Sequence, residues 1–167
     1  MVQFTDPETG DQSVLFDGHY GGAGGRPDRD GFPAVSGSNN LKNTPVEAIE
    51  AEYPLRLGRY QLDPDTAGAG RHRGGSGTVR EYEFLEQAEV QLVNERFRFG
   101  PFGVRGGESG RPGRAVLNPG TDEARSLSSK ERLHVDAGER IHIFTPGGGG
   151  YGDPAERDPD RVAADVA

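Results

Sequence analysis

The chain has 167 residues, a length that suits one domain, and only 32% of them are hydrophobic, whereas 27 glycines and 12 prolines favour many loops. Its formal net charge of −8 disfavours nucleic acid as a partner, because binding phosphates needs a basic stripe that the sequence does not show. The lack of cysteine excludes disulfides, thiolate metal sites and cysteine nucleophiles, and no apolar run is long enough to span a membrane, so we expect a soluble cytoplasmic protein.

Residues 1–40 are predicted to be a glycine-rich N-terminal segment dominated by loops. One short apolar patch at 14–16 is followed by DGHYGGAGGRPDRDG, whose glycines permit backbone angles that other residues avoid. We expect residues 41–157 to form a β-rich domain. Residues 158–167 are expected to begin a terminal helix, capped by Asp158, which the chain end cuts short as though the sequence had been truncated.

A short helix is predicted to begin at Thr44 and Pro45. Thr44 can cap it, Pro45 suits its first turn and Glu47 stands where a capping box needs an acidic side chain. The helix should end before Pro54, because the residue before a proline favours extended geometry. Asn43 and Thr44 could instead orient a substrate amide, although capping is the simpler role for Thr44.

A strand is predicted to open directly after this helix, with its first apolar residues on one face: Tyr53, Leu55 and Leu57. The apolar phase then moves to Tyr60 and Leu62, an odd offset that a strand absorbs only by inserting one extra residue. The sequence therefore predicts a β-bulge at Gly58 and Arg59.

Two further strands are predicted at 78–85 and 88–99, and their alternating apolar residues favour an antiparallel pair. Gly, Pro and Arg dominate 100–114, which indicates a long exposed loop. A short strand at 114–117 and a turn at 118–121 should follow it.

A hairpin is predicted around the turn at 136–139, because apolar residues alternate on both sides of it: Leu133, Val135, Ile141 and Ile143. If these residues share a face, His134 lies opposite His142. Two imidazoles leave a metal site largely empty, so we expect a structural pair and assign no metal ligand. Together, these elements predict a mainly β fold with short helices (α+β), an antiparallel sheet or sandwich-like domain with long Gly-rich loops.

The run PGGGGYG contains the candidate binding residues Gly147, Gly148, Gly149, Gly150 and Tyr151. Its backbone N–H groups could point at an anion, because glycine lets the chain approach a ligand closely, or the run could be a tight packing turn. It lacks the Lys and Ser/Thr of a phosphate-binding P-loop, so no ATP site is assigned to it.

Arg71 and Arg73 flank His72 in another glycine-rich corner, GAGRHRGGSG, where two guanidinium groups could clamp a carboxylate or phosphate. The alternative, which we favour, is ion pairing with the nearby Asp63 and Asp65.

His19, beside Asp17, could act as a general base, although such an arrangement occurs in any polar loop. No Gly-x-Ser-x-Gly elbow occurs, so serine hydrolase chemistry is unsupported.

Three stretches resemble the hydantoinase B/oxoprolinase family: NTPVEAIEAEYPLRLGRYQLDPDTAGAGRHRGGSGTVREYEF, NERFRFGPFGVRGGESGRPGRAVLNPGTDE and IHIFTPGGGGYGDPAERDP. The resemblance covers approximately Asp17 to the last residue. Members of the family are usually much longer, and this chain resembles only their C-terminal portion, with residues 1–16 in place of a large N-terminal region.

The resemblance implies ATP-dependent hydrolysis of a cyclic amide such as a hydantoin or 5-oxoproline, together with a hydantoinase A-type partner. It places ATP on that partner and a divalent metal in the absent N-terminal region, so this chain alone should bind no cofactor and be inactive. One alternative is a subunit of a related ATP-dependent ketone carboxylase. Another is a noncatalytic assembly module in which the glycine loops and the segment at 100–114 form an interface.

Nearly all of the positive charge is carried by arginine, since Lys42 and Lys130 are the only lysines. An acidic, lysine-poor composition is typical of proteins kept soluble at high salt. We therefore expect stability to rise with molar salt.

Overall fold

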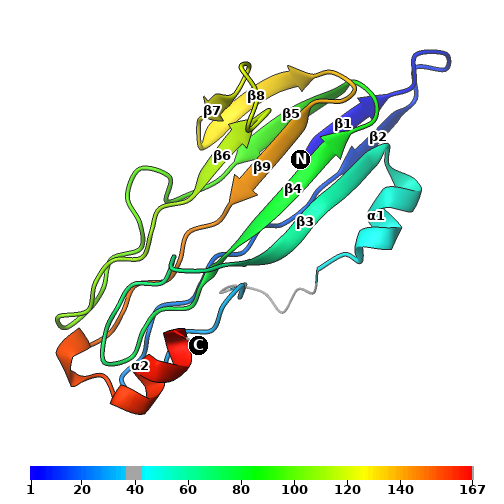
Figure 1. The fold of residues 1–167 in the computed structure, drawn as a ribbon. Coiled ribbons are helices and arrows are strands. Elements are labelled where there is room, and N and C mark those ends of the chain that lie inside the picture. The colour runs from blue at the N-terminus through cyan, green and yellow to red at the C-terminus, as the bar shows by residue number, and fades with distance from the viewer. Residues whose placement is uncertain (37–42, 167) are drawn as a thin grey trace.

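The computed structural model describes residues 1–36 and 43–166, whose strands form two antiparallel sheets (Figure 1). The four-stranded sheet has the order β2 (Gln12–Leu15), β1 (Val2–Thr5), β5 (Ala88–Val93) and β8 (Lys130–Val135). The five-stranded sheet has the order β3 (Leu55–Asp63), β4 (Gly77–Phe84), β9 (Arg140–Phe144), β6 (Arg114–Leu117) and β7 (Arg125–Leu127). The predicted mainly β fold with antiparallel sheets and long glycine-rich loops is confirmed.

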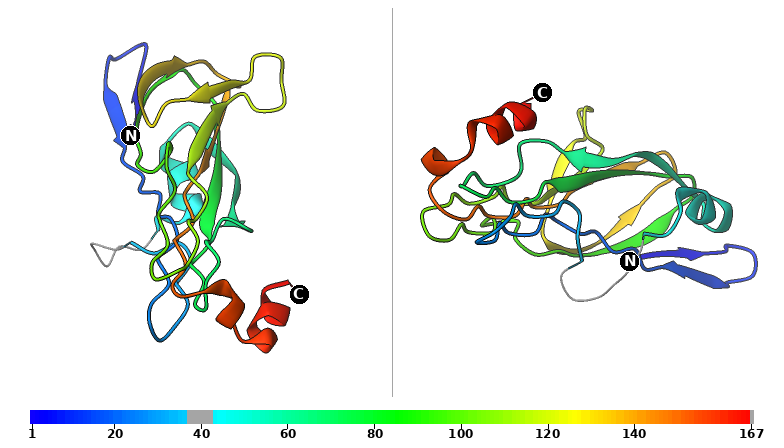
Figure 2. Two further views of the ribbon diagram at one scale, coloured as in Figure 1. Left: turned by 90° about the vertical axis from the view of Figure 1, so that its left-hand side faces the viewer. Right: turned by 90° about the horizontal axis from the view of Figure 1, so that it is seen from below.

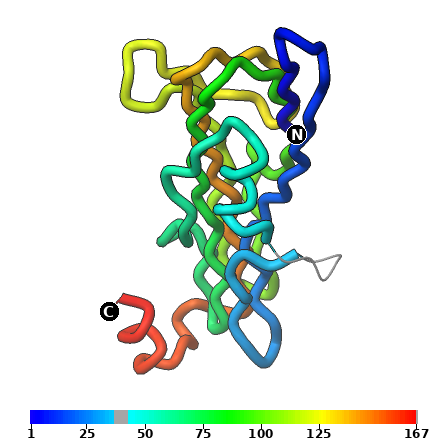
Figure 3. Tube along the Cα trace, turned by 90° about the vertical axis from the view of Figure 1, so that its right-hand side faces the viewer, coloured from blue at the N-terminus to red at the C-terminus, as the bar shows by residue number. Residues whose placement is uncertain are grey.

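Two short helices and one 3-10 turn complete the described chain: α1 (Val46–Glu52), η1 (Pro154–Glu156) and α2 (Pro159–Val166). Figure 2 and Figure 3 show an elongated molecule, with the β1–β2 hairpin near one end and α2 at the other. Neither helix has the length and apolar character that a membrane crossing requires within the described residues.

The core lies between the two sheets and is built from the inward side chains of both. The four-stranded sheet supplies Val2, Phe4, Val90, Leu92 and Val135, and the five-stranded sheet supplies Leu55, Phe84, Ala115, Ile141 and Ile143. In β5 every second residue is buried, as the alternation of Ala88, Val90 and Leu92 predicts. Ile49 of α1 joins this core, where burying such a side chain contributes roughly 1.5–3 kcal/mol.

The β-bulge predicted in β3 is confirmed. The pairing of β3 with β4 shifts register between Leu57 and Arg59, which leaves Gly58 as the extra residue. Beyond the bulge Tyr60 pairs with Arg80, so the apolar residues on both sides of Gly58 remain on one face of the strand.

Two predicted strand pairings are wrong. β4 and β5 follow each other in the chain but lie in different sheets, where β4 pairs with β3 and β9. In the same way β8 pairs with β5, whereas β9 pairs with β4 and β6. Both turns therefore cross from one sheet to the other. The sequence pattern does not show this crossing, because alternation reports only which face of a strand is buried, and the inward faces of both sheets in a sandwich are buried.

The N-terminal segment contains two strands that the sequence analysis did not predict. β1 and β2 pair with each other, and β1 extends the sheet through β5. Both strands have only four residues, which gives little alternation to detect. Residues 16–36 form no long strand, in keeping with their many glycines.

The helix starts follow the prediction in one case and depart from it in the other. α1 begins after Pro45 with no side-chain capping bond, so the predicted Thr44 cap is wrong, although Tyr53 is extended before Pro54 as expected. For α2, the Asp158 carboxylate accepts a hydrogen bond of 2.9 Å from the Asp160 N–H, which confirms the predicted cap.

Candidate functional site

Beyond the sandwich, segments from distant parts of the chain lie side by side and form what we call the glycine bundle (residues 20–25, 66–75, 103–110 and 146–152). Its central run is held by backbone hydrogen bonds on several sides. Gly148 N–H donates to Gly75 O at 2.9 Å, and Gly149 O accepts from Gly25 N–H at 2.8 Å. The N–H of Val104 donates to the Gly150 carbonyl at 2.9 Å.

The close approach of these segments is what requires glycine. A Cβ added at Gly148 would lie 1.9 Å from the Ala23 carbonyl oxygen, and one at Gly147 would lie 1.9 Å from the Thr66 carbonyl oxygen. Both glycines and Gly150 also donate their N–H groups to backbone carbonyls of neighbouring segments. Because these donors are already used, the geometry favours close packing over an anion-binding loop, and a site-shaping role for 147–150 stays a prediction.

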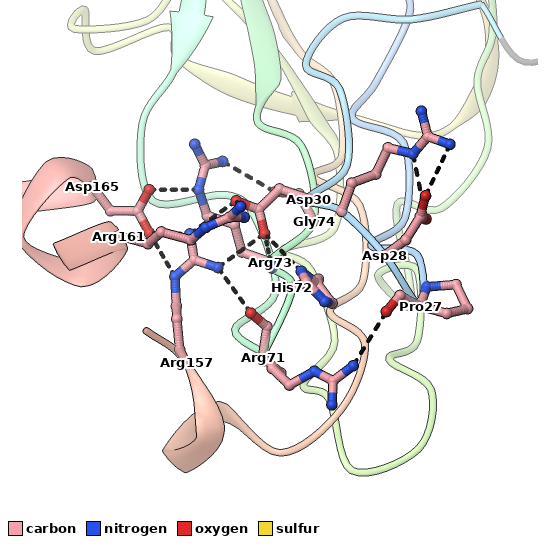
Figure 4. Close-up of polar contacts among 11 residues, drawn as sticks. Pro27, Asp28, Asp30, Arg71, His72, Arg73, Gly74, Arg157, Arg161 and Asp165 are labelled. Atoms are coloured by element: carbon pink, nitrogen blue, oxygen red, sulfur yellow. Dashed lines mark hydrogen bonds and ion pairs between the residues drawn. The ribbon is translucent and has the colours of Figure 1, made fainter. Parts of the chain in front are cut away.

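The structure brings the glycine run next to the corner that contains Arg71 and Arg73. Tyr151, half-buried, exchanges two backbone hydrogen bonds with His72, at 3.0 Å and 2.8 Å. Residues that are far apart in the sequence thus meet at the tip of the molecule, beside η1 and α2 (Figure 4).

The two corner arginines form ion pairs, but with other partners than Asp63 and Asp65. The Arg73 Nε donates to Asp165 of α2 at 2.8 Å, and Arg71 Nη1 lies 3.8 Å from the Glu156 carboxylate. The Arg71 side chain also donates to the carbonyl of Pro27 at 3.2 Å. The prediction that the two arginines form ion pairs is therefore confirmed, but the predicted partners are wrong, because the carboxylates come from the C-terminal segment.

Asp30 is the centre of this corner network (Figure 4). Its carboxylate accepts two hydrogen bonds from Arg157, at 2.9 Å and 3.0 Å, and lies 3.5 Å from Arg161 of α2. Burial alone would raise the pKa of Asp30, but hydrogen bonds and positive charge from Arg157 outweigh it and lower that pKa. Arg157, only 8% exposed, also pairs with Asp165 at 2.8 Å, so the network fastens α2 to the glycine bundle.

A second cluster lies at the inner face of β4, and sequence reasoning named only its Asp17 and His19, missing Arg80 and Tyr82. The Arg80 side chain is 1% exposed and forms an ion pair with Asp17. Its guanidinium group lies 3.8 Å from the ring centroid of Tyr60 on the neighbouring strand. The hydroxyl of Tyr82 donates to the Asp17 carboxylate. The signal in the sequence was an arginine at an inward position of a strand, since a buried charge needs a partner.

His19 completes this buried cluster, with its Nε2 2.7 Å from the Tyr82 hydroxyl. Since that hydroxyl donates to Asp17, it accepts the Nε2 hydrogen of His19, which assigns the tautomer from the network. Burial lowers the pKa of His19 to about 4, only partly opposed by the charge of Asp17. A neutral imidazole of such low basicity is a poor general base at neutral pH.

The two histidines expected opposite each other lie in different sheets, so this prediction is wrong. His134 of β8 pairs with Glu89, and His142 of β9 lies across from Glu81. No three or more His, Cys, Asp or Glu side chains gather into a possible metal site within residues 1–36 and 43–166. The donor set of the described chain therefore does not fit a divalent metal, and we derive no step through one.

Asn43 and Thr44 are exposed and precede Pro45, the N-cap of α1, and α1 lies away from the tip that carries α2 (Figure 1). The structure thus separates them from the corner arginines and the glycine run. A role of these two side chains in orienting a substrate stays a prediction.

The fold and the candidate site define a β-sandwich domain that carries a glycine bundle closed by an ionic corner. The family described as hydantoinase B/oxoprolinase matches residues 1–154, so the chain belongs to this family. The match includes the first sixteen residues, which the sequence resemblance had left out.

Relatives in several organisms share this domain. The chain is 35% identical to the B-type subunit of a putative D-/L-hydantoinase from a Pseudomonas species, over 99% of this chain and 28% of that protein. It is 38% identical to 5-oxoprolinase 1 of Arabidopsis thaliana, over 79% of this chain and 10% of that protein. The chain therefore spans less than a third of the length of these relatives.

Solved structures show the same fold. ATP-dependent caprolactamase from Pseudomonas jessenii superposes with a TM-score of 0.83 at 30% identity, covering 99% of this chain and 30% of that one. The nucleotide-free structure of an acetone carboxylase gives a TM-score of 0.71 over 89% of this chain and 24% of that one. At 17% identity the carboxylase shows likeness of fold alone.

Proposed function

We propose that the chain is the C-terminal domain of a hydantoinase B-type subunit in an ATP-dependent enzyme that opens cyclic amides. The observation that carries the proposal is the structural match to an ATP-dependent caprolactamase. The match covers 99% of this chain, with 30% sequence identity and a TM-score of 0.83. Caprolactam, hydantoin and 5-oxoproline all contain an amide within a ring, so one bond type links the named activities of the relatives.

The domain shapes the site and does not supply its reacting groups. The N–H groups of Gly147, Gly148 and Gly150 are used in packing, and the corner arginines are bound to carboxylates. Such a rigid frame can hold neighbouring polypeptide in place, which is the support that a preorganised site needs. Arg71, Arg73 and Tyr151 lie together at the tip and are the side chains we expect nearest to that site, whereas Asn43 and Thr44 lie away from them beside α1.

The remaining chemistry is assigned to polypeptide outside this chain. In this proposal a hydantoinase A-type partner uses ATP to activate the amide, and a divalent metal is held by His and Asp residues of the hydantoinase B-type region beyond this chain. The Pseudomonas relative is named as one subunit of a hydantoinase, which supports a multisubunit enzyme. Ring opening is favoured over ketone carboxylation because the amide-opening relatives are 30–38% identical, against 17% for the carboxylase.

Activity measured with and without the companion polypeptides tests the proposal. The purified chain should leave hydantoin, 5-oxoproline and caprolactam unchanged in the presence of ATP. Coexpression with a hydantoinase A-type partner and the remaining B-type region should give ATP-dependent ring opening, detected as the released amino acid derivative. The same complex without this chain is the control and should be inactive. Turnover by the isolated chain, or ketone carboxylation without ring opening by the complex, would contradict the proposal.

A further inference from the structure

A long loop between β5 and β6 carries most of the positive charge that the molecule leaves unneutralised. We call residues 94–114, which comprise this loop and the first residue of β6, the arginine loop. Seventeen arginines occur in the chain, all of them within the described residues, and eleven form ion pairs with carboxylates. Five of the other six lie in this loop, and all five are exposed: Arg96, Arg98, Arg105, Arg111 and Arg114.

Exposed aromatic rings accompany these arginines. Phe99 and Phe102 are each 68% exposed, although both are large apolar side chains. The Arg98 guanidinium lies 5.2 Å from the Phe99 ring centroid, and that of Arg96 lies 5.8 Å from the Phe102 ring centroid. Arginine and aromatic side chains are the residue types that dominate the binding energy of protein interfaces.

The arginine loop is held in one shape before any partner arrives. It folds back on itself through hydrogen bonds from Gly113 N–H to Arg96 O at 3.0 Å and from Gly110 N–H to Pro101 O at 2.9 Å. Arg96 adopts a φ of 61°, in the left-handed region that disfavours residues with a side chain. Such strain persists only where the surroundings enforce it, and it is typical of functional segments.

A groove continues the surface of the loop onto the five-stranded sheet. It has a volume of about 370 Å³ and is lined by Arg98 and Arg114, with Phe97 and Ser128 among its other residues. Arginine, hydroxyl and aromatic side chains in one groove suit carboxylate side chains with apolar neighbours. The surface is thus complementary to an acidic protein face that offers recesses for two phenyl rings.

We propose that the arginine loop is the docking surface for an acidic face of the companion region of the hydantoinase B-type subunit, the part of the relatives that lies outside this chain. The inference rests on the proposed function. Charge complementarity supports it, because the loop holds five arginines and two glutamates in a chain of net charge −8. The length of the relatives supports it too, since about 70% of the caprolactamase chain lies beyond the 30% that this chain covers.

Titration calorimetry tests the proposal by measuring the Kd between the full chain and the companion region. The companion region is produced as a separate polypeptide from the same genome. Reversing two charges, Arg98→Glu with Arg114→Glu, should raise the Kd at least about tenfold, and Phe99→Ser with Phe102→Ser should do the same. Arg26→Glu is the matched control. Arg26 is exposed, lies outside the arginine loop and, like the loop arginines, forms no ion pair among the described residues. Phe32→Ser, at a ring that is 54% exposed, controls for the loss of phenyl rings. Both controls should stay within about twofold of the unaltered chain.

Thermal unfolding of each variant checks that it is folded. If the double charge reversal does not fold, the single variant Arg98→Gln takes its place in the binding experiment. Equal weakening by Arg26→Glu and by the reversal pair would overturn the proposal, as would normal binding by both loop variants. Tight binding of a single-stranded oligonucleotide that competes with the companion region would also overturn it. A complex that forms as expected but opens no cyclic amide would sink the proposed function alone. An active complex that is insensitive to the loop variants would sink the docking surface alone.

Discussion

Arg80 and Asp17 show how single residues join the two parts of the molecule. Arg80 belongs to β4 of the sandwich, and Asp17 begins the loop that leads into the glycine bundle. Breaking such a buried pair leaves an uncompensated charge, which typically costs about 3–5 kcal/mol. The sequence indicates that an inward arginine needs a partner, but Asp17 is 63 residues away, so only the fold identifies it.

His19 gives this cluster a measurable pH dependence. Because burial lowers its pKa from 6.5 to about 4, the unfolded chain binds more protons than the folded one between these values. The contribution of the neutral His19 to the free energy of unfolding is therefore fully present above about pH 6.5. It decreases as the pH falls, by roughly 2 kcal/mol at about pH 5. Urea denaturation across this range should show a much smaller loss for His19→Gln, which cannot titrate.

The exposed His134 provides the control for this pH experiment. His134→Gln, at a side chain that is 84% exposed, should keep the pH slope of the unaltered protein. A slope that is equally steep in His19→Gln would show that the buried imidazole does not cause it.

At the scale of elements, the glycine bundle is the feature that sequence reasoning described least completely. The composition predicts loops, and PGGGGYG indicates either an anion-binding loop or a packing turn, of which the geometry favours the second. Its partners, however, are backbone segments from three other, distant parts of the chain, and hydrogen bonds between backbone groups leave no pattern of side chains to detect. The loops are consequently an ordered part of the fold.

A single methyl group should therefore damage the bundle. In Gly148→Ala the new Cβ would lie 1.9 Å from a backbone oxygen, so the neighbouring segment has to move, and we expect a loss of at least about 2 kcal/mol. Gly24→Ala is the matched control, because its Cβ would meet its nearest atom at 3.6 Å, an ordinary contact. Denaturant unfolding compares the two, and equal stability of both variants would mean that the close approach is not required.

At the scale of the whole molecule, most of the arginines are neutralised by ion pairs, and an excess of exposed carboxylates remains. Most arginines are paired, yet the net charge stays at −8, so carboxylates repel one another over the surface. We expect the free energy of unfolding to rise between about 0.1 and 2 M KCl, because salt screens that repulsion.

Exposed glutamates that form no ion pair in the described chain allow a matched test of the salt effect: Glu8, Glu52 and Glu123. Their joint replacement by Gln should raise stability at low salt and reduce the response to KCl. Indifference of the unaltered protein to molar salt would disprove the expected high-salt adaptation.

The sequence by itself determined the strand faces, the bulge at Gly58, the cap at Asp158 and the family. These features depend on residues close together in the chain or on motifs that the chain spells out directly. Only the tertiary structure decided that consecutive strands separate into two sheets, that distant glycine segments pack together and that Asp30 gathers arginines from the C-terminal segment. The physical reason is that alternation, glycine content and charge state what each residue requires of its surroundings, whereas the partner that meets the requirement is chosen by packing between segments far apart in the chain.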